Sequence, residues 1–116
     1  MSKYIVRDKS FNFALRIIKS YKYLTEQKRE YVLSKQVLRS GTAIGALIRE
    51  AEQGESKADF IHKLAIALKE AKETEYWLDL LFHSDYIEEK SYESIHADVE
   101  ELIKLLISII KTSKNI

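Results

Sequence analysis

Apolar side chains recur every three or four residues along most of the chain, which is the spacing of one face of an α-helix. Polar stretches interrupt this spacing at three places and divide the chain into four segments. The pattern therefore predicts helices over residues 11–24, 30–53, 57–84 and 91–112. Because short connections join antiparallel neighbours, we expect residues 1–116 to form a single all-α domain, an antiparallel up-down-up-down four-helix bundle.

The expected helix ends carry residues that commonly stop or start helices. Residues 1–8 are interpreted as a short lead-in, and Gly54 is expected to end the second helix. Ser, Thr and Asp can cap a helix by accepting a hydrogen bond from a free backbone N–H. The residues that fit this role are Asp8 or Ser10, Thr25, Ser56 and Ser91.

All three glycines of the chain lie in residues 38–54, and two of them, Gly41 and Gly45, fall inside the second helical segment. A glycine within a helix costs roughly 1 kcal/mol relative to alanine, so two of them need a compensating gain. The apolar stripe continues through them at Ile44 and Ile48. We therefore expect a neighbouring helix to approach closely at the two glycines, which makes this helix the packed centre of the bundle.

The first and last helices carry more apolar surface than one packing face requires. Around each of them the apolar residues cover an arc of about 200°, whereas a helix lying on a single core needs about 100° or somewhat more. Contiguous apolar surface in excess of this usually marks an interface. The residues that we expect to contact other copies of the chain are Phe13, Ile17, Leu105, Ile107 and Ile109.

The net charge of +1 hides a division between the two halves of the chain. Residues 1–50 carry 11 Lys and Arg against 4 Asp and Glu, a net charge of +7, whereas residues 51–116 carry 8 against 14, a net charge of −6. This division indicates either a basic face for an anionic partner or complementary surfaces that meet between subunits. Helices that merely differ in their solvated charges would give the same pattern.

One carboxylate interrupts the apolar seam of the third helix. Glu75 occupies a position where the pattern predicts an apolar side chain, and a buried carboxylate needs a partner. If the second and third helices are antiparallel, Arg39 lies at the level of Ala71. We therefore expect an ion pair of Arg39 with either Glu70 or Glu75.

Enzyme chemistry has little support in the sequence. There is no Cys, no glycine-rich phosphate loop and no Gly-x-Ser-x-Gly motif. Bundles can hold di-iron sites built from Glu-x-x-His pairs, and Glu93 and His96 have this spacing, as do Asp59 and His62. These two pairs are expected at opposite ends of the bundle, so we predict no metal, no cofactor and no enzymatic activity. His96 is expected to be a hydrogen-bonded histidine of the core or of an interface.

Membrane insertion is not expected. The N-terminus lacks the apolar segment of a signal peptide, and the longest nearly apolar run, residues 102–110, is far shorter than the roughly 20 residues of a membrane span. We expect a soluble, cytoplasmic protein without a membrane partner.

A basic surface is predicted on the first helix and the turn that follows it. Cations bind phosphates, and an exposed aromatic ring can stack on a base. The residues that we expect to contact nucleic acid are Arg16, Lys19, Lys22, Tyr23, Lys28 and Arg29.

The chain also resembles a known family from about residue 10 to residue 114, and residues 38–81 carry the signature of that family. The most specific parts of this signature are the motifs at residues 38–41, 56–60 and 64–70, which read LRSG, SKADF and LAIALKE. They resemble the four-helix bundle proteins encoded by intervening sequences in bacterial 23S rRNA genes. The sequence departs from that family's pattern at Ala43, where Ser is usual, and at Leu47, where Asn is usual.

This resemblance implies a left-handed bundle that assembles as a homopentamer, in a family whose role is largely unassigned. The family is also similar to the accessory variability protein of diversity-generating retroelements, which binds nucleic acid through a basic surface. Our first hypothesis is a non-enzymatic oligomer that associates with RNA or with an RNA–protein complex. The alternative is a homo-oligomeric protein-binding scaffold without affinity for nucleic acid.

Overall fold

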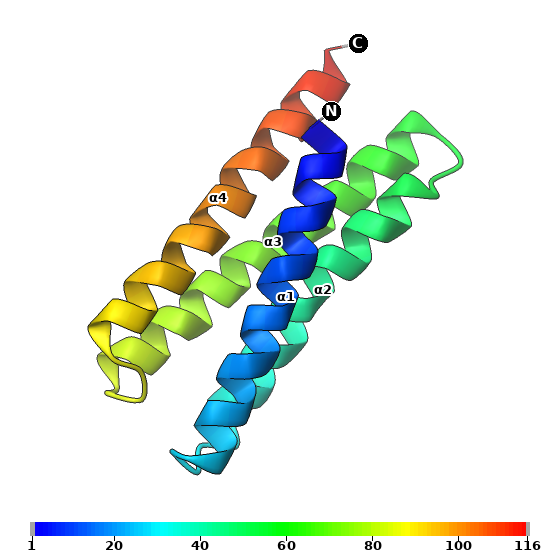
Figure 1. The fold of residues 1–116 in the computed structure, drawn as a ribbon. Coiled ribbons are helices and arrows are strands. Elements are labelled where there is room, and N and C mark those ends of the chain that lie inside the picture. The colour runs from blue at the N-terminus through cyan, green and yellow to red at the C-terminus, as the bar shows by residue number, and fades with distance from the viewer. Residues whose placement is uncertain (1, 116) are drawn as a thin grey trace.

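The computed structural model describes residues 2–115, with side chains from residue 5 onwards, and this part of the chain forms four helices (Figure 1). These are α1 (Ser2–Glu26), α2 (Leu33–Glu52), α3 (Lys57–His83) and α4 (Glu89–Lys114). Each helix packs against two others: α1 against α2 and α4, and α3 against α2 and α4. The four-helix bundle predicted from the apolar spacing is therefore confirmed.

Contacts between neighbouring helices show that they are antiparallel. Arg39 of α2 bonds to Glu70 of α3, whereas Glu50, further along α2, bonds to Lys63, which comes earlier in α3. The same reversal holds for α1 with α2, α1 with α4, and α3 with α4. Figure 1 shows the chain turning back at each connection. The left-handed sense of the bundle stays a prediction.

Helix α1 begins nine residues earlier than predicted, so residues 2–8 are helical and the interpretation as a lead-in was wrong. Val6 continues the buried face of α1 and is only 1% exposed. Ser10 is also buried, and its hydroxyl donates to the carbonyl oxygen of Arg7 at 2.9 Å within the helix. Neither Ser10 nor Asp8 therefore caps α1, because both lie inside it.

The connection from α1 to α2 also differs from the prediction. Thr25 lies inside α1, where its hydroxyl donates to the carbonyl oxygen of Tyr21 at 2.9 Å. The side chain that holds the start of α2 belongs to Glu30, whose carboxylate accepts hydrogen bonds from the backbone N–H groups of residues 32, 33 and 34 at 2.6–3.1 Å. Burial alone would raise the pKa of Glu30, but these backbone hydrogen bonds hold that pKa below its usual value.

The remaining two helix starts give one confirmed cap and one correction. The Ser56 hydroxyl accepts a hydrogen bond from the Asp59 backbone N–H at 3.0 Å, as predicted for the start of α3. Helix α4 begins at Glu89, two residues before its predicted start. Ser91 therefore lies in the first turn, where its hydroxyl donates to Glu88 at 3.3 Å instead of capping the helix.

The close approach predicted at the two glycines of α2 is present. A Cβ atom placed on Gly41 would lie 2.8 Å from Cγ1 of Ile17, and one placed on Gly45 would lie 3.3 Å from Oγ of Ser10 and 3.5 Å from the Ser10 backbone oxygen. Helix α1 therefore packs tightly against α2 because both positions lack a side chain.

The core between the helices includes residues that were predicted to lie at an interface. Phe13 and Ile17 are 2% and 0% exposed, and Ile109 is 8% exposed, so they cannot contact another subunit across the outer surface. The prediction allowed each of these helices one packing face, but α1 and α4 each pack against two neighbours and bury much of the apolar arc. Leu105 packs partly against the core, and Ile107 remains exposed.

None of the helices in the part of the chain that the structure describes has a stretch both long and apolar enough to span a bilayer.

Candidate functional site

A cleft of about 600 Å³ lies between α1 and α4, near the end of the bundle where α1 finishes and α4 begins. Helices α1 and α4 make the least contact of the neighbouring pairs, which leaves this space between them. Its floor is apolar and comes from all four helices and the turn before α4: Leu24, Val37, Leu78, Leu81, Ile87 and Ile95. Its polar lining is Arg16, Lys19, Ser20, Tyr23, Glu88 and Ser91.

Three of the six residues predicted to contact nucleic acid lie in this cleft. Arg16, Lys19 and Tyr23 line it, and Tyr23 is 43% exposed, so one face of its ring can reach a ligand. Lys19 and Tyr23 are one helical turn apart and therefore lie on the same side of α1. An apolar floor beside a cation and an exposed aromatic ring can hold a flat base while the cation contacts a phosphate.

The other three predicted residues surround the same end of α1. Lys22 is exposed on the last turns of the helix, and Lys28 and Arg29 are exposed in the connection to α2. This connection is ordered by backbone hydrogen bonds, including one from the Glu30 N–H to the Leu24 carbonyl oxygen at 2.9 Å. Arg29 has a positive φ of 54°, which turns the chain sharply and directs it into α2.

The cations of this surface are not equivalent. Arg16 forms an ion pair with Asp98 of α4 at 2.5 Å and donates to the Ser94 hydroxyl at 3.1 Å, so much of its charge is engaged across the mouth of the cleft. No ion pair is found for Lys19, Lys22, Lys28 or Arg29 within residues 2–115. These four residues, which we call the cation cluster, therefore carry positive charge that no carboxylate of the described residues pairs with.

The ion pair predicted for Arg39 is present in one of its two forms. Arg39 bonds to Glu70 at 3.2 Å and also to Glu73, which the sequence did not indicate. Glu75 does not contact Arg39, because it faces α4, where its carboxylate lies 3.0 Å from Nε2 of His96. His96 is thus a half-buried histidine of the α3–α4 seam, with a carboxylate as its partner.

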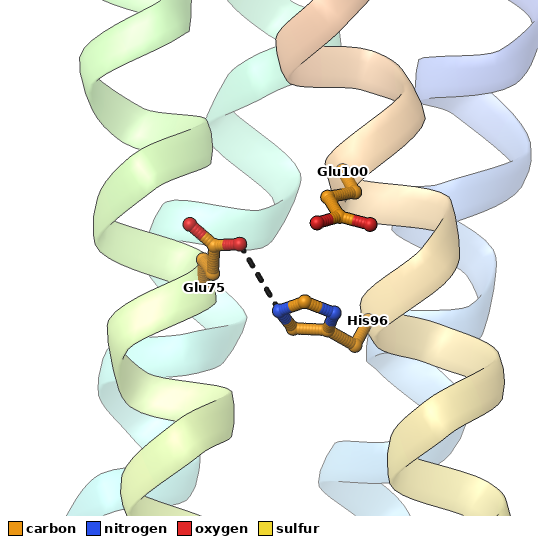
Figure 2. Close-up of side chains that lie close together, drawn as sticks. All are labelled: Glu75, His96 and Glu100. Carbon is orange, nitrogen blue, oxygen red and sulfur yellow. Dashed lines mark ion pairs between the residues drawn. The ribbon is translucent and has the colours of Figure 1, made fainter.

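Figure 2 shows that a third titratable residue, Glu100, joins this pair. One oxygen from each of Glu75 and Glu100 and one imidazole nitrogen of His96 all lie within 4.8 Å of one another. This cluster could not be predicted from the sequence, because it depends on the register between α3 and α4. The spacing of His96 and Glu100, one helical turn apart, was the available signal.

Tyr92 lies one helical turn before His96 on α4 and adds a further polar contact between α3 and α4. Its hydroxyl donates to Asp79 at 2.5 Å, and its ring stacks on Phe82 with a centroid separation of 4.3 Å. Burial, the hydrogen bond to Asp79 and the nearby charges of Asp79, Glu75 and Glu100 raise the pKa of Tyr92 to about 12. The seam between α3 and α4 therefore carries negative charge from several carboxylates.

The arrangement of the helices places the half of the chain with net positive charge beside the half with net negative charge. The basic half of the chain forms α1 and α2, the acidic half forms α3 and α4, and the two pairs pack side by side. The α1–α2 surface also carries three exposed apolar side chains on one side of α1: Phe11 at 51%, Leu15 at 52% and Ile18 at 38% exposure. We call these three residues the α1 stripe, and they were not among the predicted interface residues.

These features define a small antiparallel helical bundle with a cationic end and a polar seam. The sequence model of the family described as 23S rRNA-intervening sequence protein matches residues 2–108, and the chain belongs to this family. The resemblance found in the sequence motifs is thereby confirmed, while the likeness to the retroelement accessory protein stays a prediction.

A solved relative supports the same assignment. A crystal structure from Bacteroides thetaiotaomicron, described as a protein with unknown function from the S23 ribosomal protein family, is 61% identical to this chain. The similarity covers 96% of this chain and 99% of that one, with a TM-score of 0.95. A search of curated proteins gave no match.

Proposed function

We propose that the protein is a non-enzymatic, oligomeric bundle that associates with RNA or with an RNA–protein complex. The observation that carries this proposal is the cation cluster of Lys19, Lys22, Lys28 and Arg29, which is exposed and free of ion pairs within residues 2–115. Phosphate contacts need such free cations, because a cation already paired with a carboxylate must give up that partner first. The rRNA context in the name of the family points in the same direction.

The cleft beside the cluster suggests how single-stranded RNA binds. Lys19 contacts a phosphate at the mouth while Tyr23 stacks on the adjacent base, and the apolar floor packs against the face of a base. Unpaired bases are the part of RNA that proteins most often read by stacking. Arg16 contributes less than the sequence suggested, because Asp98 and Ser94 already engage its guanidinium.

Association of several chains would strengthen the binding of RNA to this surface. The α1 stripe provides exposed apolar area on α1, and none of its residues belongs to the cation cluster. Contacts between two different faces of the same chain close into rings when the rotation allows it. A ring repeats the cation cluster and raises the avidity for a long RNA.

The binding proposal predicts a salt-dependent affinity that reversal of the cluster abolishes. A short labelled single-stranded RNA should bind the full chain at about 50 mM salt, and log K should fall linearly with log salt concentration up to about 200 mM. Lys19→Glu with Lys28→Glu should weaken binding at least about tenfold and reduce the slope by about 2, one for each lost phosphate contact. Fluorescence polarisation measures both quantities.

A matched control reverses two exposed lysines elsewhere. Lys69→Glu with Lys72→Glu on α3 changes the net charge equally, and both residues lie outside the cleft. If this control weakens binding as much as the cluster variant, the attraction is a property of the net charge and not of this surface. If the wild-type chain shows no binding at low salt, the RNA proposal is wrong.

The second candidate function is a protein-binding scaffold, which the separation of the basic and acidic halves favours. In that case the positive surface of one chain is covered by the negative surface of the next. Assembly would then weaken with salt, while the wild-type chain would show no affinity for RNA at any salt concentration.

A further inference from the structure

The cluster of Glu75, His96 and Glu100 lies on the α3–α4 seam, away from the cleft and the cation cluster that carry the proposed function. Figure 2 shows the three side chains converging from two helices, with Glu75 on α3 and the other two on α4. His96 and Glu100 are four residues apart, so one helical turn brings them to the same face. The three groups thus approach one point from two rigid elements.

The spacing of the donor atoms is close to that of a metal site. Zinc lies about 2.0–2.2 Å from nitrogen and oxygen ligands, so neighbouring ligand atoms around it are about 3.4 Å apart. Nε2 of His96 and Oε2 of Glu75 are 3.0 Å apart, and all three donors lie within 4.8 Å of one another. Glu100 is exposed, so a small rotation of its side chain completes the set.

The surroundings favour a cation and fix the imidazole. Three carboxylates, from Glu75, Asp79 and Glu100, lie along the seam, and the imidazole of His96 lies among them. The Tyr92 ring contacts the His96 ring with a centroid separation of 5.2 Å, and Tyr92 is itself held by its bond to Asp79. This ring contact restricts the orientation of the His96 imidazole.

We propose that Glu75, His96 and Glu100 bind a divalent transition-metal ion, with Zn²⁺ as its best match. One nitrogen and two carboxylate oxygens leave the fourth position of a tetrahedral ion for water. The imidazole selects zinc and its transition-metal neighbours over Mg²⁺ and Ca²⁺, which prefer oxygen ligands alone. A bound ion fastens α3 to α4 at mid-seam, in place of the direct contact between His96 and Glu75.

This set differs from the histidine pairs considered in the sequence. Those pairs joined His96 with Glu93 and His62 with Asp59, whereas here His96 and Glu75 meet across two helices. Glu93 is exposed, and it is not part of the cluster.

The test is a calorimetric titration of the full chain, without an affinity tag and after treatment with a chelator, against ZnCl₂. We expect about one zinc ion per chain, with binding unaffected by excess MgCl₂. His96→Ala should weaken binding at least tenfold, and Glu100→Gln, at an exposed position that does not affect folding, should weaken it severalfold. Thermal unfolding of the wild-type chain should shift upwards with zinc, because the ion binds only the folded state.

His62→Ala is the matched control, because His62 is an exposed histidine of α3 outside the cluster. It should leave the zinc affinity unchanged. The proposal is wrong if the wild-type chain binds no zinc, if Glu100→Gln and His96→Ala bind it as tightly as the wild type, or if His62→Ala removes the binding. Circular dichroism of each variant verifies that the helices are intact.

Discussion

Truncation of Ile17 to alanine should lower the free energy of unfolding by about 3 to 4 kcal/mol, the largest single effect that we expect in this bundle. Ile17 is fully buried, and its branched side chain fills the space that the absent side chain of Gly41 leaves on α2. Removal of three carbon atoms there opens a cavity that the two tightly packed backbones cannot close. Chemical denaturation, with an unchanged m-value, measures this loss.

The contact between Gly41 and Ile17 predicts that Gly41→Ala lowers the stability of the wild-type chain but raises the stability of the Ile17→Ala variant. In the wild-type chain the new Cβ would lie 2.8 Å from Ile17, so overpacking should cost about 1 to 3 kcal/mol against a gain of about 1 kcal/mol in helix propensity. In the Ile17→Ala background the clash is absent, and Gly41→Ala should stabilise the bundle. Equal effects of Gly41→Ala in both backgrounds would show that the two residues do not pack as described.

Replacement of Glu30 by alanine should cost about 2 to 3 kcal/mol at neutral pH, because three backbone N–H groups at the start of α2 lose a charged acceptor. Glu30 is only 8% exposed, so water replaces the carboxylate poorly. Because folding lowers the pKa of Glu30, its contribution is present above the ordinary carboxyl pKa of 4.5 and is lost as the pH falls through the lower, folded value.

Denaturation of both chains across the acid range tests this prediction. The difference between wild type and Glu30→Ala should be largest near neutral pH and should shrink below pH 4.5. Glu93→Ala removes an exposed carboxylate of α4 and should have little effect at any pH. A Glu30 difference that is independent of pH would mean that the ionised carboxylate is not the cap.

The architecture could be predicted from the sequence because its signals are local or nearly so. Apolar spacing located four helices, and the two glycines inside α2 indicated a close helix contact that the structure places at Ile17 and Ser10. The reach of Arg39 towards Glu70 followed from the short turn between α2 and α3. Each of these inferences needs only the helical period and one antiparallel pairing.

The predictions were wrong where the structure depends on a single residue or on the packing of two helices. The start of α1 was missed because Val6 is the only buried apolar side chain among residues 5–10. The cap of α2 was missed because Glu30 is not a usual capping residue and reaches forward across the turn. The direction in which Phe13 and Phe11 face, one inwards and one outwards, depends on where two neighbouring helices lie.

For the candidate sites, too, features within one helix could be predicted, whereas contacts between helices could not. Arg16, Lys19 and Tyr23 were selected from one helix, and they do gather at one cleft, but the engagement of Arg16 by Asp98 depends on the packing of α4. The seam cluster of Glu75 and His96 was invisible for a similar reason, since it requires the register of α3 against α4. Neither contact can be read from the helical period alone, because each depends on the register between two packed helices.

The central claim is that copies of the chain join along the α1 stripe, since this assembly underlies the avidity proposed for RNA. Multi-angle light scattering of the purified chain tests it most directly. We expect a mass that is a multiple of 13.5 kDa, with five copies as the family resemblance implies, and a fall towards the single chain for Leu15→Glu but not for Val32→Glu in the α1–α2 turn. A mass of 13.5 kDa for the wild-type chain at high concentration would contradict the account.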